Sequence, residues 1–214
     1  MKSFGSWFAL LLLPLLLAAG CSKLEKNGLY YYYFSNKIYL SERRDLLYIE
    51  FIDGISEAEK QAIVQSDASL HPWTRQGRTF GSETFDGTGG AGVAVLQSRG
   101  RISGAKFQRF RAMAGVKSLC YMYETEQSSD PFAVSDGFSV QLGVGTTPAQ
   151  LEALADQYGC TVRLWGPTGA HDVYFVTVPK SVSMGVVRLS AVFQETHLFG
   201  WTSPNFVIFG GLDV

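Results

Sequence analysis

The sequence predicts an α+β protein made of two tandem ferredoxin-like units, each with the element order β-α-β-β-α-β, preceded by a short β-hairpin. Three observations support this prediction. Strand-like and helix-like segments alternate in the same order over residues 45–125 and again over residues 132–214. The first helix of each unit opens with a capping box. A tyrosine-rich stretch with a short polar break precedes the first unit.

The tyrosine-rich stretch is the first predicted element. Residues 29–34 (Leu-Tyr-Tyr-Tyr-Tyr-Phe) and 37–40 (Lys-Ile-Tyr-Leu) flank the polar pair Ser35-Asn36. Aromatic and β-branched residues on both sides of a short polar link are typical of a β-hairpin. The tyrosines fit either a sheet face that covers a core or a platform that stacks on a ligand, and the first is the commoner use of such a stripe.

The first unit begins with an apolar strand at residues 46–52, followed by a turn and a helix. The helix starts at Ser56, because Ser56 and Glu59 have the spacing of a capping box. The remaining elements are an extended piece at 70–73, a strand at 92–97, a helix near 103–114 and a strand at 116–123.

A polar linker, residues 126–131, is predicted between the two units. The second unit opens with a strand at 138–144, and its first helix begins at Thr147, with Pro148 and Gln150 completing the start signal. Gly159 is predicted to end this helix. The remaining elements are an extended piece at 161–165, a strand at 173–178, a helix near 183–193 and a strand at 199–209.

The first twenty residues have the features of a secretory signal peptide. One charge, Lys2, precedes an apolar run at residues 7–17, which is shorter than the roughly 20 residues of a membrane-spanning helix. Small residues then lead to Cys21, in a pattern that resembles the lipobox of bacterial lipoproteins. The resemblance implies a signal peptide at 1–20, an acylated Cys21 that holds the chain to a lipid bilayer, and a tether and hairpin at 21–44. The alternative is an ordinary signal peptide with a chance cysteine.

The predicted location is the cell envelope. Ser22 does not resemble the aspartate that retains enteric lipoproteins at the inner membrane, so the lipobox resemblance favours the outer membrane. An oxidising envelope would allow Cys120 and Cys160 to form a disulfide, and two buried free thiols are the equally open alternative.

Composition and motifs argue against several classes of function. The net charge is −1 with scattered basic residues, whereas nucleic-acid surfaces need a clear basic excess. The three histidines lack metal-ligand spacing, and the glycine-rich residues 87–92 lead into a strand rather than a helix, unlike a dinucleotide loop. The sequence therefore predicts no catalytic residues, metal, cofactor or small-molecule ligand.

Residues 138–206 resemble the propeptides of subtilisin-like proteases, particularly those of surface subtilases in Bacteroides-like bacteria. Three stretches carry the resemblance: residues 138–162 (FSVQLGVGTTPAQLEALADQYGCTV), 173–195 (VYFVTVPKSVSMGVVRLSAVFQE) and 197–209 (HLFGWTSPNFVIF). Ser203 stands where such propeptides typically carry a glutamate before the Pro-Asn or Pro-Asp turn. The tyrosine-rich hairpin is also similar to the beginning of these precursors.

The resemblance implies a protein-binding rather than a catalytic role. None of the Asp-x-Gly, His-Gly-Thr and Gly-Thr-Ser-Met-Ala stretches of a subtilase triad occurs in the 214 residues. The implied partner is a subtilisin-like protease, inhibited or assisted in folding in trans. The implied contact is an extended tail with Phe206, Val207, Ile208 and Phe209 as anchors. The alternatives are a surface scaffold or interaction lipoprotein that kept only the propeptide fold, and a remnant of a protease precursor.

Overall fold

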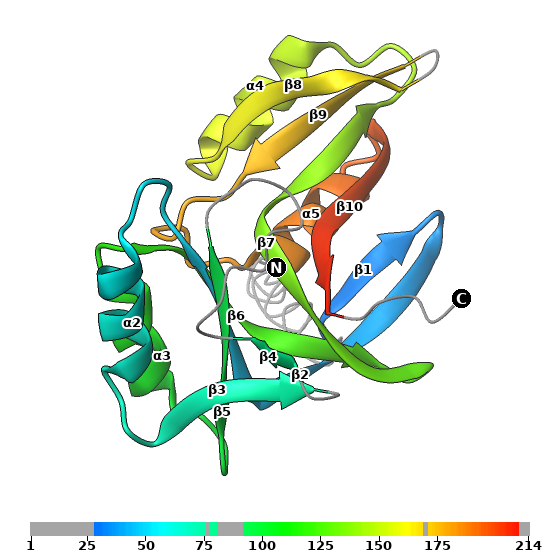
Figure 1. Ribbon diagram of the computed structural model, residues 1–214. Helices are drawn as coiled ribbons and strands as arrows, with labels where there is room; N and C mark the ends of the chain where they lie inside the picture. Colours follow the sequence, from blue (N-terminus) through cyan, green and yellow to red (C-terminus); the bar gives the residue numbers. More distant parts are fainter. Residues whose placement is uncertain (1–27, 76–77, 81–91, 169–170, 210–214) are drawn as a thin grey trace, which may run out of the picture.

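The computed structural model describes residues 28–75, 78–80, 92–168 and 171–209, and within them the strands join into a single sheet (Figure 1). The sheet has ten strands in these ranges. They are β1 (Tyr30–Tyr33), β2 (Asn36–Phe51), β3 (Leu70–Arg75), β4 (Arg78–Phe80), β5 (Val93–Ser98), β6 (Val116–Thr125), β7 (Ser128–Leu142), β8 (Thr161–Thr168), β9 (His171–Thr177) and β10 (Phe199–Ile208). The helices are α2 (Glu57–Gln65), α3 (Gly104–Ala112), α4 (Pro148–Gln157) and α5 (Val186–Glu195).

The prediction of two tandem ferredoxin-like units is wrong, because all the strands belong to one mostly antiparallel sheet. Its main path is β4-β3-β5-β2-β6-β7-β9-β8, with β1 paired to β2 and β10 paired to β7. The two halves repeat one pairing order, β3-β5-β2-β6 and β8-β9-β7-β10. The β6–β7 pairing makes the halves continuous, so neither is an independent unit.

The residues expected to form a linker instead make a tight turn and the start of a long strand. β6 ends at Thr125 and β7 begins at Ser128, whose backbone N–H donates to the Thr125 hydroxyl at 3.1 Å. β6 and β7, on either side of this turn, pair with each other, and Tyr123 lies opposite Phe132. The polarity of residues 126–131 reflects the exposed end of a hairpin rather than a break between domains. The boundary predicted between the tether and hairpin (21–44) and the first unit (45–125) also falls inside a strand, because β2 runs without interruption through residues 44 and 45.

Both predicted capping boxes are confirmed. The Glu59 N–H donates to the Ser56 hydroxyl at 3.3 Å, and the Ser56 N–H donates back to the Glu59 carboxylate at 3.0 Å. Thr147 and Gln150 make the same reciprocal pair at the start of α4. Gly159 follows α4 with a φ of 67°, the left-handed conformation that commonly stops helices. None of the helices in the described ranges is long and apolar enough to span a bilayer.

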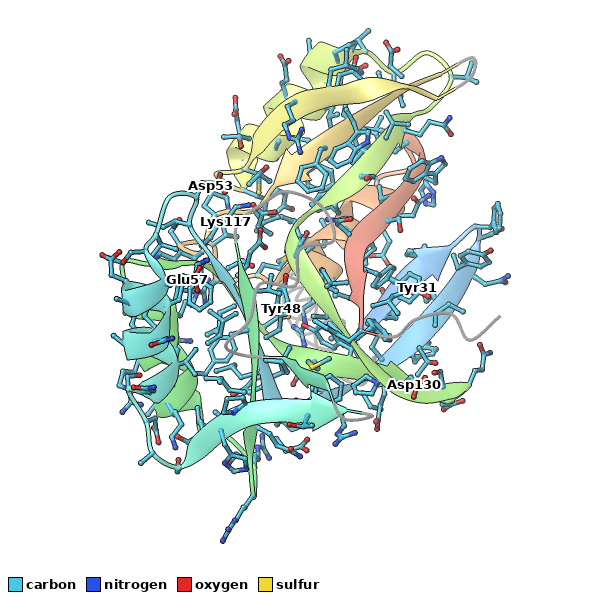
Figure 2. All side chains as sticks on the ribbon, viewed as in Figure 1. Tyr31, Tyr48, Asp53, Glu57, Lys117 and Asp130 are labelled. Carbon is cyan, nitrogen blue, oxygen red and sulfur yellow. The ribbon has the colours of Figure 1, made fainter. Side chains whose placement is uncertain are left out.

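The first half of the sheet is buried on both faces. Leu47, Ile49 and Phe51 alternate along β2 and pack against α2 and α3. The intervening Tyr48 points to the opposite face, where it packs in a cluster that includes Phe209 (Figure 2). The second cluster explains why residues 46–52 read as a nearly continuous apolar run. Its fully or nearly buried members are Leu46, Tyr48, Trp73, Val95, Met122, Ala133 and Phe209.

An ion-pair bridge holds three neighbouring strands together where the halves meet. The Lys117 ammonium on β6 lies 2.8 Å from Glu50 of β2 and 3.0 Å from Asp136 of β7. Figure 2 shows Lys117 at this junction. Both carboxylates are largely shielded from water, so the shared cation stabilises them more than an exposed pair would.

The β1–β2 hairpin projects from the side of the sheet, beside α5 and β10 (Figure 1). Tyr30 pairs with Tyr39 near its base, and Tyr33 pairs with Asn36 at the two-residue turn. The Tyr31 ring packs edge-on against Phe206 of β10, with 4.7 Å between ring centroids. The hairpin is therefore fixed to the second half of the protein as well as to β2.

A carboxylate, Asp67, connects α2, β3 and α3. It accepts hydrogen bonds from the Ser69 N–H and hydroxyl, and it lies 3.0 Å from the Lys106 ammonium and 2.6 Å from the Arg109 guanidinium. The Ser69 hydrogen bonds, with those of Lys106 and Arg109, hold the pKa of the Asp67 carboxyl well below its usual range.

We expect Asp67→Asn to reduce the free energy of unfolding by about 1–2 kcal/mol at pH 7, through lost charge-assisted hydrogen bonds. A pKa that is lower in the folded state gives stability that is complete above the unfolded-state pKa near 3.9. This stability is lost as pH falls toward the lowered folded-state pKa. Urea denaturation of both proteins at pH 7, 4 and 2.5 should show the difference shrinking below about pH 4.

The matched control is Asp53→Asn, since Asp53 is exposed on the turn that follows β2. This substitution should leave the unfolding free energy unchanged within about 0.5 kcal/mol at each pH. A cost of Asp67→Asn that stays the same at pH 7 and pH 2.5 would contradict the assignment.

Candidate functional site

The outer edge of β8 is the described surface best suited to binding another protein. β8 lies at one end of the sheet and, within the described residues, pairs only with β9. Two large apolar side chains stand next to each other on it: Leu164 is 56% exposed and Trp165 is 54% exposed. An edge strand presents unpaired backbone N–H and C=O groups, so it can accept a further strand from another chain.

An aromatic and cationic stack extends from this edge onto the sheet face. The Arg163 guanidinium lies 4.7 Å from the Trp165 ring centroid and 4.9 Å from the Phe175 ring centroid. The two rings are themselves 5.2 Å apart and tilted by 39°. The β8–β9 register shifts between Leu164 and Gly166, and Arg163 and Trp165 lie on the same face of the sheet because both contact the Phe175 ring. We call Arg163, Leu164 and Trp165 the β8 edge patch.

Phe175, the ring beneath Arg163 and Trp165, can take its position only because residue 137 is a glycine. Phe175 is buried although it points away from the core formed with α4 and α5. A Cβ on Gly137 would lie 2.6 and 2.7 Å from atoms of the Phe175 ring and 2.3 Å from the Val176 carbonyl oxygen. Gly137 therefore lets the ring lie against the backbone of β7, which holds Phe175 beneath Trp165 and Arg163.

A groove of about 370 Å³ lies between the two halves and adjoins a second hollow of about 440 Å³. Its cationic groups are engaged in structural contacts: Arg44 pairs with Glu42, Arg111 donates to the Val182 carbonyl, and the Lys180 ammonium donates to two carbonyls at the end of α3 and the start of β6. Among the described residues, no group of three or more His, Cys, Asp or Glu side chains is arranged to hold a metal ion. The groove is thus mainly a seam between the halves.

The two cysteines that were candidates for a disulfide are free thiols in the structure. The Cys120 thiol lies at the groove and contacts the Val134 carbonyl oxygen at 3.4 Å. Burial raises the pKa of Cys120 to about 12, which keeps it protonated and poorly nucleophilic at neutral pH. Cys160 is buried in the separate core formed with α4 and α5. Both thiols are therefore unpaired in the structure, with Cys160 buried and Cys120 only half-buried.

The predicted partner-binding tail is not free in the structure. Phe206, Val207 and Ile208 pair with Val134, Ala133 and Phe132 of β7, so their segment is part of the sheet. Phe209 is 1% exposed and packs against Tyr48 and Trp73. Ile208 alone among the four is largely exposed. Phe206, Val207 and Phe209 thus pack within the protein itself, and Ile208 is the exposed exception.

The structure brings none of the predicted site residues to the β8 edge patch. Cys21, the predicted lipidation site, lies outside the described residues, as do residues 87–91 of the glycine-rich stretch. From the sequence, residues 161–165 are predicted only as an extended piece, without a functional role. The available signal was an Arg-x-Trp spacing in a short strand, which puts a cation and an indole on one face.

Comparisons of the chain with known proteins identified no relative. No protein-family model matches the chain, and no significant match was found among curated proteins or solved structures.

Proposed function

We propose that the chain is a membrane-anchored, non-catalytic lipoprotein that binds another protein by adding a strand to β8. The observation that carries this proposal is the β8 edge patch: a strand edge that no other described strand pairs with, on which Leu164 and Trp165 are each more than half exposed. Large exposed apolar groups beside unpaired backbone groups are costly for a protein to keep unless they have a partner. In this proposal an acylated Cys21 holds the protein in the cell envelope, at the outer membrane.

The energetics of such binding divide between backbone and side chains. Backbone hydrogen bonds to β8 would supply affinity for any extended segment, while the alternating side chains would select its sequence. Fully burying a leucine-sized side chain contributes about 1.5–3 kcal/mol, and Leu164 and Trp165 each have about half of their surface left to bury. Tryptophan and arginine are also the residue types that most often dominate interface energies. Trp165, supported by Phe175 and flanked by Arg163, is thus the proposed centre of the contact.

The proposed partner is a subtilisin-like protease, which the chain would inhibit or help to fold in trans. The support for this class of partner is the resemblance of residues 138–206 to subtilase propeptides. The alternative is a scaffold or interaction lipoprotein whose partner belongs to another class, and it uses the same strand edge.

We expect Leu164→Lys to weaken inhibition of a bacterial subtilisin-like protease by the purified mature chain about tenfold or more, because a lysine on the edge opposes strand addition. The apparent inhibition constant would be measured from the hydrolysis of a chromogenic peptide. Hydrogen exchange on the wild-type complex should show new protection of the β8 amides.

The matched control is Val144→Lys, which introduces the same charge at a fully exposed apolar residue in the connection between β7 and α4. It should inhibit as well as the wild type. Equal inhibition by the Leu164→Lys variant would exclude the β8 edge patch as the contact. Absence of inhibition by the wild-type chain would exclude this protease as the partner and favour the scaffold alternative.

A further inference from the structure

The tip of the β1–β2 hairpin carries exposed aromatic rings that nothing in the protein covers within the described ranges. Phe34 is 77% exposed and Tyr33 is 60% exposed, with their ring centroids 4.8 Å apart. Tyr39 and Lys37, on the returning strand, are exposed as well. The hairpin tip is defined as residues 33–36, and its exposed aromatic rings are those of Tyr33 and Phe34.

The backbone at the tip is unfavourable for the residue that occupies it. The turn has two residues, Phe34 and Ser35, and Phe34 has a φ of 54°. Two-residue hairpin turns use glycine or asparagine where φ is positive, and a bulky residue there costs about 1–2 kcal/mol. A phenylalanine that is both strained and exposed contributes little to folding, which points to a role outside the protein.

The root of the hairpin is held firmly, so the tip has a defined direction. The Glu195 carboxylate at the end of α5 accepts hydrogen bonds from Tyr30 at 2.6 Å, Tyr32 at 3.1 Å and Lys37 at 3.3 Å. These hydrogen bonds, that of Tyr30 foremost, lower the pKa of Glu195. The Lys37 ammonium also lies 4.1 Å from the Tyr30 ring centroid. The base of the hairpin is therefore fixed to α5, and the tip extends from it in a defined direction.

The hairpin follows the predicted membrane anchor closely in the sequence. Gly28 follows Cys21 by seven residues, so the acyl chains on Cys21 can lie no more than about 25 Å from the base of the hairpin. We propose that the hairpin tip inserts Tyr33 and Phe34 into the interface of the lipid bilayer that holds the anchor. This inference rests on the lipidation in the proposed function, and it adds a second membrane contact that orients the protein.

The chemistry of the tip fits the headgroup region of a bilayer. Tyrosine places its ring at this level with the hydroxyl toward water, and phenylalanine reaches the acyl boundary. Two contacts, the acyl anchor and the tip, would restrict how the β8 edge patch is presented to a partner.

The experiment uses the full acylated chain reconstituted in liposomes of phosphatidylethanolamine and phosphatidylglycerol. An NBD fluorophore is attached to Ser35→Cys at the tip or to Glu57→Cys on α2, with the unsubstituted chain treated in parallel as background. Glu57 lies on the side of the molecule away from the hairpin (Figure 2). Lipids with a spin label on the acyl chain should quench the fluorophore at residue 35 and leave the one at residue 57 unquenched.

Two variants separate membrane contact from structure. Tyr33→Ser/Phe34→Ser should reduce quenching at residue 35 to the level at residue 57, while the chain still floats with the liposomes. Phe34→Gly should also reduce quenching, yet raise the melting temperature by about 2 °C because glycine accepts a positive φ. If Phe34 had a purely structural role, Phe34→Gly would not lower the quenching at residue 35 while raising the melting temperature.

Several outcomes would overturn the inference. If the wild-type chain floats with liposomes but residue 35 is not quenched, the anchor stands and the tip contact does not. If residue 35 becomes shielded without liposomes as protein concentration rises, the tip meets a second copy of the chain instead. If the wild-type chain fails to float, the lipidation itself fails and the inference falls with it. Loss of protease inhibition alone would affect only the proposed function.

Discussion

Replacing Phe209 with alanine is expected to lower the free energy of unfolding by about 3–4 kcal/mol. The ring is 1% exposed and lies between Tyr48 and Trp73, with centroid distances of 5.9 and 6.1 Å. Its removal leaves a cavity on the second face of the first half of the sheet, where Leu46 and Met122 also pack. Urea denaturation followed by circular dichroism measures the loss.

The neighbouring residue provides the control for this prediction. Ile208 is largely exposed, so Ile208→Ala should change the unfolding free energy by less than about 0.5 kcal/mol. If Phe209 were instead a partner-binding anchor, Phe209→Ala would leave stability nearly unchanged and reduce only binding. A small stability loss would therefore revive the tail that the sequence indicated.

Gly137→Ala is expected to lower the free energy of unfolding by about 2–3 kcal/mol, although it adds a single methyl group. That methyl group would meet the Val176 carbonyl oxygen at 2.3 Å, and a backbone atom in a paired strand cannot move aside cheaply. The Phe175 ring would also be displaced from β7, which removes the support of Trp165. Thermal and urea denaturation measure the first effect, and the indole fluorescence reports the second.

Gly100→Ala is the matched control, because a Cβ at Gly100 would meet nothing within 4 Å. Alanine there should be neutral or slightly stabilising, since it reduces the freedom of the unfolded chain. A Gly137→Ala protein as stable as the wild type would show that β7 and β9 can separate without cost. The position of Phe175 beneath Arg163 and Trp165 would then not depend on Gly137.

Local signals in the sequence predicted local structure well. Ser56 with Glu59, and Thr147 with Gln150, indicated two helix starts because a capping box involves only neighbouring residues. The apolar stretch at 46–52 likewise indicated a strand. Whether that strand was covered on one face or two depends on Phe209, far away in the sequence, and periodicity alone cannot reveal such a partner.

The misjudged features depend on strand pairings that composition alone does not reveal. Residues 126–131 are polar both in a linker and at the end of an exposed hairpin, so composition did not distinguish them. The exposure of Leu164 and Trp165 follows from β8 being the last strand of its sheet path, which no stretch of eight residues encodes. The same reasoning applies to Phe206–Phe209, whose apolar character fits a docking tail or a core strand equally well.

The packing of Phe209 against Tyr48 has a consequence for the order in which the chain matures. The first half of the sheet cannot complete its second hydrophobic face until a residue separated from it by most of the sequence has been delivered. Contacts of such high contact order form slowly, since a large loop must close first. A nascent chain with the proposed export signal would thus remain incompletely folded during synthesis, the condition in which a polypeptide can be threaded through a translocation channel.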